Sequence, residues 1–86
     1  MKISVELTLS PLQDNFEEPI MSFIKKLRAS SFELKENPLS TQIYGEYDAL
    51  MAFLTKEVKE VFGLLNNGVL FMKIVSSDRS DYEPHF

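Results

Sequence analysis

Hydrophobic and polar residues alternate strictly over the first ten residues of the chain. The apolar positions fall on one side of an extended backbone and the polar positions on the other. Alternation with β-branched residues is typical of a strand that buries one face. We therefore predict a strand over residues 2–10, ended by Pro11 and followed by a polar loop. Its apolar residues are Ile3, Val5, Leu7 and Leu9.

Two later segments carry apolar residues at the spacing of an amphipathic helix. The first is residues 16–30, where Asn15 is a suitable N-cap and Pro19 falls in the first turn, which tolerates proline. The second is residues 46–65, with Gly63 near its C-terminal end. The apolar stripes are Ile20, Phe23, Ile24 and Leu27 in the first helix, and Leu50, Leu54, Val58, Val61, Phe62 and Leu65 in the second.

Three further segments have the pattern of strands. Residues 31–37 and 39–45 are separated by an Asn-Pro turn, so these two strands are expected to form a hairpin. Residues 69–77 are apolar on nearly both faces. Such a strand is predicted to be either an inner strand of the sheet or one that a partner covers.

The predicted order of elements, β-α-β-β-α-β, is the split βαβ pattern of the ferredoxin-like fold. This α+β fold has a four-stranded antiparallel sheet with both helices on one face. A length of 86 residues allows one domain, which we place at residues 1–77, with residues 78–86 as a loosely held polar tail. The uncovered face of the sheet is expected to expose Glu6 and Thr8. A mixed face of this kind suits a ligand site, sheet-to-sheet dimerisation, or both.

Composition and charge exclude several classes of function. The formal net charge is −4, whereas a nucleic-acid partner requires a basic surface, so none is expected. The chain has no cysteine, which excludes a disulfide-stapled scaffold and thiol catalysis. It shows no signal peptide and no apolar stretch of about 18 residues. We therefore expect a cytoplasmic protein without a membrane partner.

The sequence contains no recognisable catalytic or metal-binding constellation. His85 is the only histidine and lies beside the C-terminus, where no partners are expected to hold it for catalysis. The carboxylates are scattered, without the spacing of a metal site. Glu6 and Glu46 are the only bases near a hydroxyl in the pattern, and nothing in the sequence places them together. We expect no enzyme activity, no metal and no cofactor.

The segment "NPLSTQIYGEYDALM", residues 37–51, carries more hydrogen-bonding side chains than a strand that only fills a core requires. Taken singly, each residue is commonly structural. Gly45 suits a positive φ or a close backbone approach, and Glu46 suits the first turn of a helix. Together they leave an excess of donors and acceptors, which indicates a ligand site.

At this segment the chain resembles the YkoF-like thiamine- and hydroxymethylpyrimidine-binding proteins of the wider thiamine-binding superfamily. The most specific family motif is an Asn, two residues, then Ser-Thr-Gln-Ile-aromatic-Gly-Glu-Tyr-Asp and a later Met, matched here from Asn37 to Met51. The stretches "VELTLSPL", "EEPIMSFIKKL" and "VLFMKIV" are similar to the first strand, first helix and last strand of the family. The resemblance covers residues 2–76 and departs at Pro38-Leu39, where the family more often has small residues.

This resemblance implies the ferredoxin-like fold and a non-catalytic protein that binds thiamine or its hydroxymethylpyrimidine moiety in thiamine salvage or uptake. It also implies homodimers, or dimers of dimers, formed through the sheet. The alternative is a structural or regulatory homodimerisation module with no small-molecule ligand. A ligand binder gains stability as its ligand is added, and a bare assembly module does not.

Roles for the candidate ligand-binding residues follow from chemical fit. Thr41 and Ser40 would hydrogen-bond the pyrimidine or its hydroxymethyl group, and Tyr44 would supply an aromatic wall. Glu6 or Glu46 would accept from the amino group or face the thiazolium cation. Thr41 and Tyr44 lie on opposite faces of an ideal strand, so both can contact ligand only if the pocket wraps an edge or a dimer partner contributes. The full candidate set is Thr41, Ser40, Glu6, Glu46, Tyr44 and Asn37.

Overall fold

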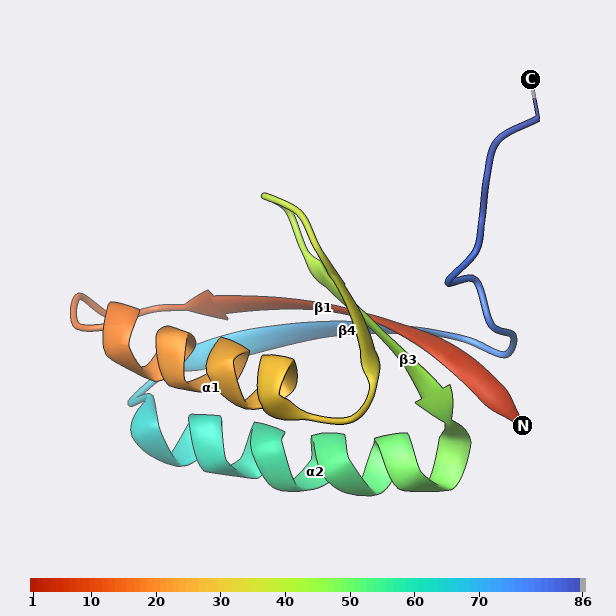
Figure 1. The fold of residues 1–86 in the computed structure, drawn as a ribbon. Coiled ribbons are helices and arrows are strands. Elements are labelled where there is room, and N and C mark those ends of the chain that lie inside the picture. Colours follow the sequence, from red (N-terminus) through yellow and green to blue (C-terminus); the bar gives the residue numbers. More distant parts are fainter. Residues whose placement is uncertain (86) are drawn as a thin grey trace.

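The computed structural model describes residues 1–85 and has the predicted order of elements. A single layer of strands lies against a layer of two helices, which is the ferredoxin-like α+β fold (Figure 1). The elements are β1 (Lys2–Pro11), α1 (Glu17–Ala29), β2 (Glu33–Glu36), β3 (Thr41–Glu46), α2 (Tyr47–Leu64) and β4 (Gly68–Val75). Neither helix is long and apolar enough to cross a membrane, within the residues described.

The four strands are antiparallel to their neighbours and lie in the order β2-β3-β1-β4. β1 is therefore central, with Glu6 opposite Gln42 of β3 on one side and opposite Lys73 of β4 on the other. β4 lies at an edge of the sheet. Of the two expectations for this apolar strand, the inner position is wrong, and cover by a partner stays a prediction.

The core lies between the helices and the inner face of the two central strands, because the alternating apolar residues of β1 all point toward the helices. One predicted core residue is misplaced. Phe62 is 43% exposed because it lies at the margin of the helical stripe, in a surface hollow that Met72 of the edge strand also lines. The buried cluster is Ile3, Val5, Leu7, Phe23, Leu27, Ile43, Leu50, Leu54, Val61 and Leu65.

The N-cap prediction for Asn15 is wrong, whereas Gly63 lies near the C-terminal end of α2 as predicted, without a positive φ. α1 has Phe16 as its N-cap and no side-chain capping hydrogen bond, so Asn15 does not cap it. The loop is held by Gln13 instead, whose side-chain oxygen accepts from the main-chain N–H of Asn66 at 2.6 Å. Gly63 lies inside α2, which ends at Leu64 without any residue of positive φ in the part of the chain described.

Gly45 has the second of its two predicted roles, a close approach. Its φ is not positive, but the ring of Phe32 lies where a side chain would stand, with Cδ1 2.5 Å from an ideal Cβ position. The same ring packs against Phe53 of α2 with 5.4 Å between centroids. Glycine therefore allows an aromatic side chain to close the core where β3 passes into α2.

After β4 the chain is first held against the open face of the sheet and then runs away from it toward the C-terminal end (Figure 1). The loosely held tail stays a prediction. The hydroxyl of Ser4 donates to the carbonyl of Ser77 at 2.7 Å and accepts from the N–H of Arg79 at 2.8 Å. Lys35 of β2 donates to the carbonyl of Ser80. We call residues 77–82 the return segment.

Candidate ligand-binding site

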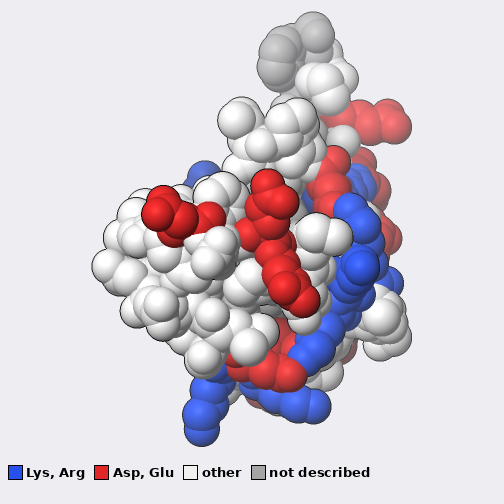
Figure 2. Space-filling view, turned by 90° about the vertical axis from the view of Figure 1, so that its left-hand side faces the viewer, with Lys and Arg blue, Asp and Glu red and all other residues white. Residues whose placement is uncertain are grey.

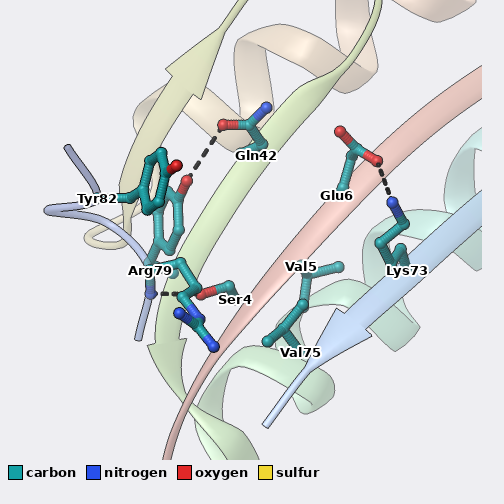
Figure 3. Close-up of a pocket in the computed structure, with 9 residues that line it drawn as sticks. Ser4, Val5, Glu6, Gln42, Lys73, Val75, Arg79 and Tyr82 are labelled. Atoms are coloured by element: carbon teal, nitrogen blue, oxygen red, sulfur yellow. Dashed lines mark hydrogen bonds and ion pairs between the residues drawn. The ribbon is translucent and has the colours of Figure 1, made fainter. Parts of the chain in front are cut away.

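A pocket of about 390 Å³ lies on the open face of the sheet, between the central strands and the return segment (Figure 3). This volume is within the usual range of small-molecule sites, about 300–1,000 Å³. The pocket forms because β1, β3 and β4 supply a floor and the return segment adds a wall on one side. Its lining residues are Ser4, Val5, Glu6, Gln42, Tyr44, Lys73, Val75, Arg79 and Tyr82.

One end of the pocket is formed by two side chains that can hydrogen-bond a ligand, Glu6 and Gln42. Glu6 and Gln42 are register partners on the two central strands, so their side chains stand next to each other on the open face. The carboxylate of Glu6 accepts from the hydroxyl of Ser40 at 3.1 Å, and its other oxygen lies 3.6 Å from Nζ of Lys73. The Lys73 side chain is 73% exposed, so this ion pair is weak and readily exchanged.

An aromatic wall adjoins this pair. Tyr44 is only 9% exposed, and its hydroxyl donates to the side-chain oxygen of Gln42 at 3.2 Å. Burial raises the pKa of Tyr44 above its ordinary value of 10.0, and nearby carboxylates, Glu33 foremost, raise it further. Its hydroxyl therefore stays protonated and able to donate at neutral pH. Tyr82 of the return segment lines the same pocket and is largely exposed.

The other end of the pocket holds an arginine. The main chain of Arg79 is tied to Ser4, and its guanidinium extends beside Ser4 toward Val75 (Figure 3). Within residues 1–85, that guanidinium has no recorded ion pair. A pocket with a carboxylate and an amide at one end and a cation at the other can orient a polar aromatic ligand.

The structure places some of the six residues predicted from the sequence at the pocket and the others away from it. Glu6 and Tyr44 line the pocket, and Ser40 reaches it through its hydrogen bond to Glu6. Thr41 is opposite Leu7 in the sheet and is buried on the helix side, because side chains alternate along β3.

The two remaining candidates have structural partners away from the pocket. Asn37 closes the hairpin between β2 and β3, and its side-chain oxygen accepts from the N–H groups of Leu39 at 2.9 Å and Ser40 at 3.0 Å. Glu46 lies at the end of β3, where it accepts from the amino group of Met1 at 2.9 Å.

A smaller hollow of about 220 Å³ contains Asn37, Ser40 and Thr41, between the hairpin, β1 and α1. Its volume is below the usual range for ligand pockets. Much of its lining comes from core side chains such as Leu7 and Phe23. The pocket on the open face is therefore the better candidate site.

Sequence reasoning did not select five of the residues that line the pocket with polar or aromatic groups. Ser4 and Gln42 had a usable signal, because each shares the alternation of Glu6 and Tyr44. Lys73 had a weaker signal, because it is the single cation in an otherwise apolar strand. Arg79 and Tyr82 had none, since their approach depends on the path of the return segment. The five are Ser4, Gln42, Lys73, Arg79 and Tyr82.

The charged side chains are mixed on the end of the molecule that Figure 2 presents. Basic side chains run along one edge of this view, and acidic side chains stand beside and across from them, so no broad basic field is visible there. Within residues 1–85, no three acidic or histidine side chains gather where they could hold a metal ion.

Comparison with known proteins places this fold among solved structures. A protein from Thermotoga maritima, described as a "putative thiamine biosynthesis/salvage protein", superposes with a TM-score of 0.79 at 19% identity, covering 90% of this chain and 85% of that one. A protein from Streptococcus pneumoniae gives a TM-score of 0.81 at 25% identity, covering 91% and 89%. A domain of unknown function from Bacillus cereus gives 0.74 at 12%, covering 90% and 77%.

No protein-family model matches the chain, and no curated protein matches it in sequence. At the identities of the solved structures, the likeness establishes the fold. The ligand must therefore be argued from the pocket itself.

Proposed function

We propose that this protein binds an aminopyrimidine, either thiamine or its hydroxymethylpyrimidine moiety, without transforming it chemically. The observation that carries the proposal is the pairing of Glu6 with Gln42 beside the ring of Tyr44, in a pocket of about 390 Å³. The fold likeness to the Thermotoga maritima protein, whose description concerns thiamine, supports the same ligand class.

The pocket groups match the edge of an aminopyrimidine. The exocyclic amino group donates to the Glu6 carboxylate, and the side-chain nitrogen of Gln42 donates to a ring nitrogen. The oxygen of Gln42 is already taken by the hydroxyl of Tyr44, which fixes the amide orientation. Once a ligand covers them, hydrogen-bonding groups of this kind reject rings that lack the matching pattern, because mispaired groups stay unsatisfied.

Ser40 has a supporting role in this proposal. Its hydroxyl donates to Glu6, which orients the carboxylate. Of the two faces of β3, we assign the ligand to the face of Tyr44 rather than that of Thr41. Thr41, Asn37 and Glu46 then maintain the strand and its hairpin without contacting the ligand.

We further propose a cytoplasmic homodimer that acts in thiamine salvage or uptake. The exposed apolar side chains of β4 favour association through the sheet, since a single chain leaves this edge strand uncovered. The same observation favours the second candidate function, a homodimerisation module without a ligand. These side chains are Val69, Phe71, Met72 and Ile74.

The test is titration of the purified protein with thiamine, and separately with hydroxymethylpyrimidine, by calorimetry and thermal shift. We expect saturable binding that Glu6→Gln weakens at least about tenfold, because a charge-assisted hydrogen bond is lost. The control is Glu46→Gln, which removes a carboxylate outside the pocket and should bind as the wild type does.

Absence of both heat and thermal shift with either compound would overturn ligand binding in favour of the dimerisation module. Formation of product from either compound, in a turnover assay, would overturn the non-catalytic role.

A further inference from the structure

The charged side chains that line the pocket carry a net positive charge. The lining contains one acidic side chain, Glu6, and two basic ones, Lys73 and Arg79. Lys73 lies 3.6 Å from Glu6 and offsets its charge. Arg79 is the basic lining residue that has no recorded ion pair within residues 1–85.

The two arginines of the chain differ in their partners. Arg28 is held by Glu36 through two hydrogen bonds, both 2.8 Å, the fork arrangement that guanidinium groups form with carboxylates. Arg79 has no such partner within residues 1–85 and lies at the pocket. The guanidinium of Arg79 is therefore available to bind an anionic group of a ligand.

Arg79 is positioned at the pocket by its own main chain. Its N–H donates to the hydroxyl of Ser4, and that hydroxyl also donates to the carbonyl of Ser77. Ser4 is 7% exposed, so this anchor is shielded from water. The main chain that carries the guanidinium is therefore fixed on the wall of the pocket, even though the side chain itself is exposed.

We infer that the natural ligand carries a phosphate monoester, and that the guanidinium of Arg79 binds this phosphate while the ring lies between Glu6 and the tyrosines. The inference rests on the proposed function, because it concerns the same pocket. It selects a phosphorylated hydroxymethylpyrimidine over thiamine, whose thiazolium cation would face Arg79 and Lys73 with a like charge.

The distance between the Glu6 end and the Arg79 end of the pocket fits such a ligand. Lys73 is opposite Glu6, and Val75, beside which the guanidinium lies, is opposite Ser4. Positions two residues apart on a strand are roughly 7 Å apart, which matches the scale of a substituted pyrimidine with its phosphate arm.

The test is calorimetric titration of the full chain at low salt with four compounds: hydroxymethylpyrimidine, its phosphate ester, thiamine and inorganic phosphate. We expect the phosphate ester to bind about tenfold more tightly than the alcohol, since a charge-assisted pair is added. Thiamine should bind more weakly than the phosphate ester. Raised salt should reduce the advantage of the ester.

Arg79→Gln should remove the advantage of the phosphate ester, so that the ester and the alcohol bind this variant with affinities within about twofold of each other, since the charge-assisted pair is lost. The control is Lys25→Gln, which removes an exposed positive charge from α1, away from the pocket, and should retain the advantage.

The outcomes separate this inference from the proposed function. Equal affinity for the alcohol and its ester would overturn the inference and leave the proposed function intact. An advantage that persists in Arg79→Gln would overturn the assignment of Arg79. Inorganic phosphate binding as tightly as the ester, or no binding of any compound, would overturn both, because recognition of the ring would be absent.

Discussion

The hydroxyl of Ser4 holds the main chain of Arg79, accepting from its N–H at 2.8 Å across 75 positions of sequence. Ser4 belongs to the first strand and Arg79 to the return segment, so this contact fixes a wall of the pocket onto its floor. Ser4 faces the open side because it alternates with Ile3 and Val5, which enter the core.

Ser4→Ala is expected to release the return segment from the sheet. The change removes both hydrogen bonds of the hydroxyl and should lower the free energy of unfolding by about 1–2 kcal/mol. Hydrogen exchange should show faster exchange of the Arg79 amide, and ligand affinity should fall as the wall loosens. Thr8→Ala is the control, because Thr8 is on the same strand and bonds only the carbonyl of Leu39, at 3.3 Å. Equal protection of the Arg79 amide in wild type and Ser4→Ala would refute the anchor.

The face of β3 that contacts the ligand can be read from two substitutions. Tyr44→Leu removes the aromatic wall and the donor to Gln42, and should weaken hydroxymethylpyrimidine binding at least about tenfold. Thr41→Val keeps the side-chain volume on the buried face and should leave binding within about twofold. Calorimetry on both variants, with folding checked by circular dichroism, decides the matter. The reverse ranking would move the site to the smaller hollow that Thr41 lines.

Gly45→Ala should destabilise the fold by about 1–3 kcal/mol, because the new methyl group overlaps the ring of Phe32. Gly63→Ala is the matched control: nothing lies within 4 Å of its Cβ position, and alanine there should stabilise α2 by about 0.5–1 kcal/mol. Urea denaturation measures both. In a Phe32→Leu background the cost of Gly45→Ala should shrink, and an unchanged cost would show that the ring is not its cause.

The ion pair between Arg28 and Glu36 should make the free energy of unfolding fall more steeply as the pH becomes acidic. The hydrogen bond from Arg28, followed by its charge, lowers the pKa of Glu36 below its ordinary value of 4.5. A carboxyl with a lowered pKa stabilises the fold above its unfolded pKa, and this contribution disappears as the pH falls through the folded pKa. Both groups are exposed, so the effect is small.

Arg28→Gln should therefore reduce stability at neutral pH slightly and flatten its decline below pH 4.5. Urea midpoints across this range measure the difference, and parallel curves for the two proteins would contradict the prediction. Lys59→Gln, another exposed cation on a helix, is a suitable control because it is in no recorded ion pair within residues 1–85.

The sequence was sufficient for the order of elements and the class of fold. The alternation of Ile3 to Leu9 and the helical stripes are periodic, and a period reports directly which side of an element meets the core. The ends of the helices were less predictable. Asn15 is a good cap by residue type, but the side chain of Gln13 holds that loop through a distant turn.

The sequence also determined part of the site. Alternation placed Glu6 on the open face, and the polar excess around Tyr44 pointed to the region of the sheet where the candidate pocket lies. The same alternation warned that Thr41 and Tyr44 face opposite ways, which the structure confirms.

Tertiary structure alone decided which strand is at the edge and what closes the pocket. The apolar pattern of β4 fits either an inner strand or a partner-covered one, since a one-dimensional pattern records burial preference and not the identity of the neighbour. The approach of Arg79 to Ser4 is a contact between the two ends of the chain, set by the path of the backbone after β4. Local sequence fixes the direction of each side chain, whereas long-range packing fixes which side chains meet, and this pocket depends on both.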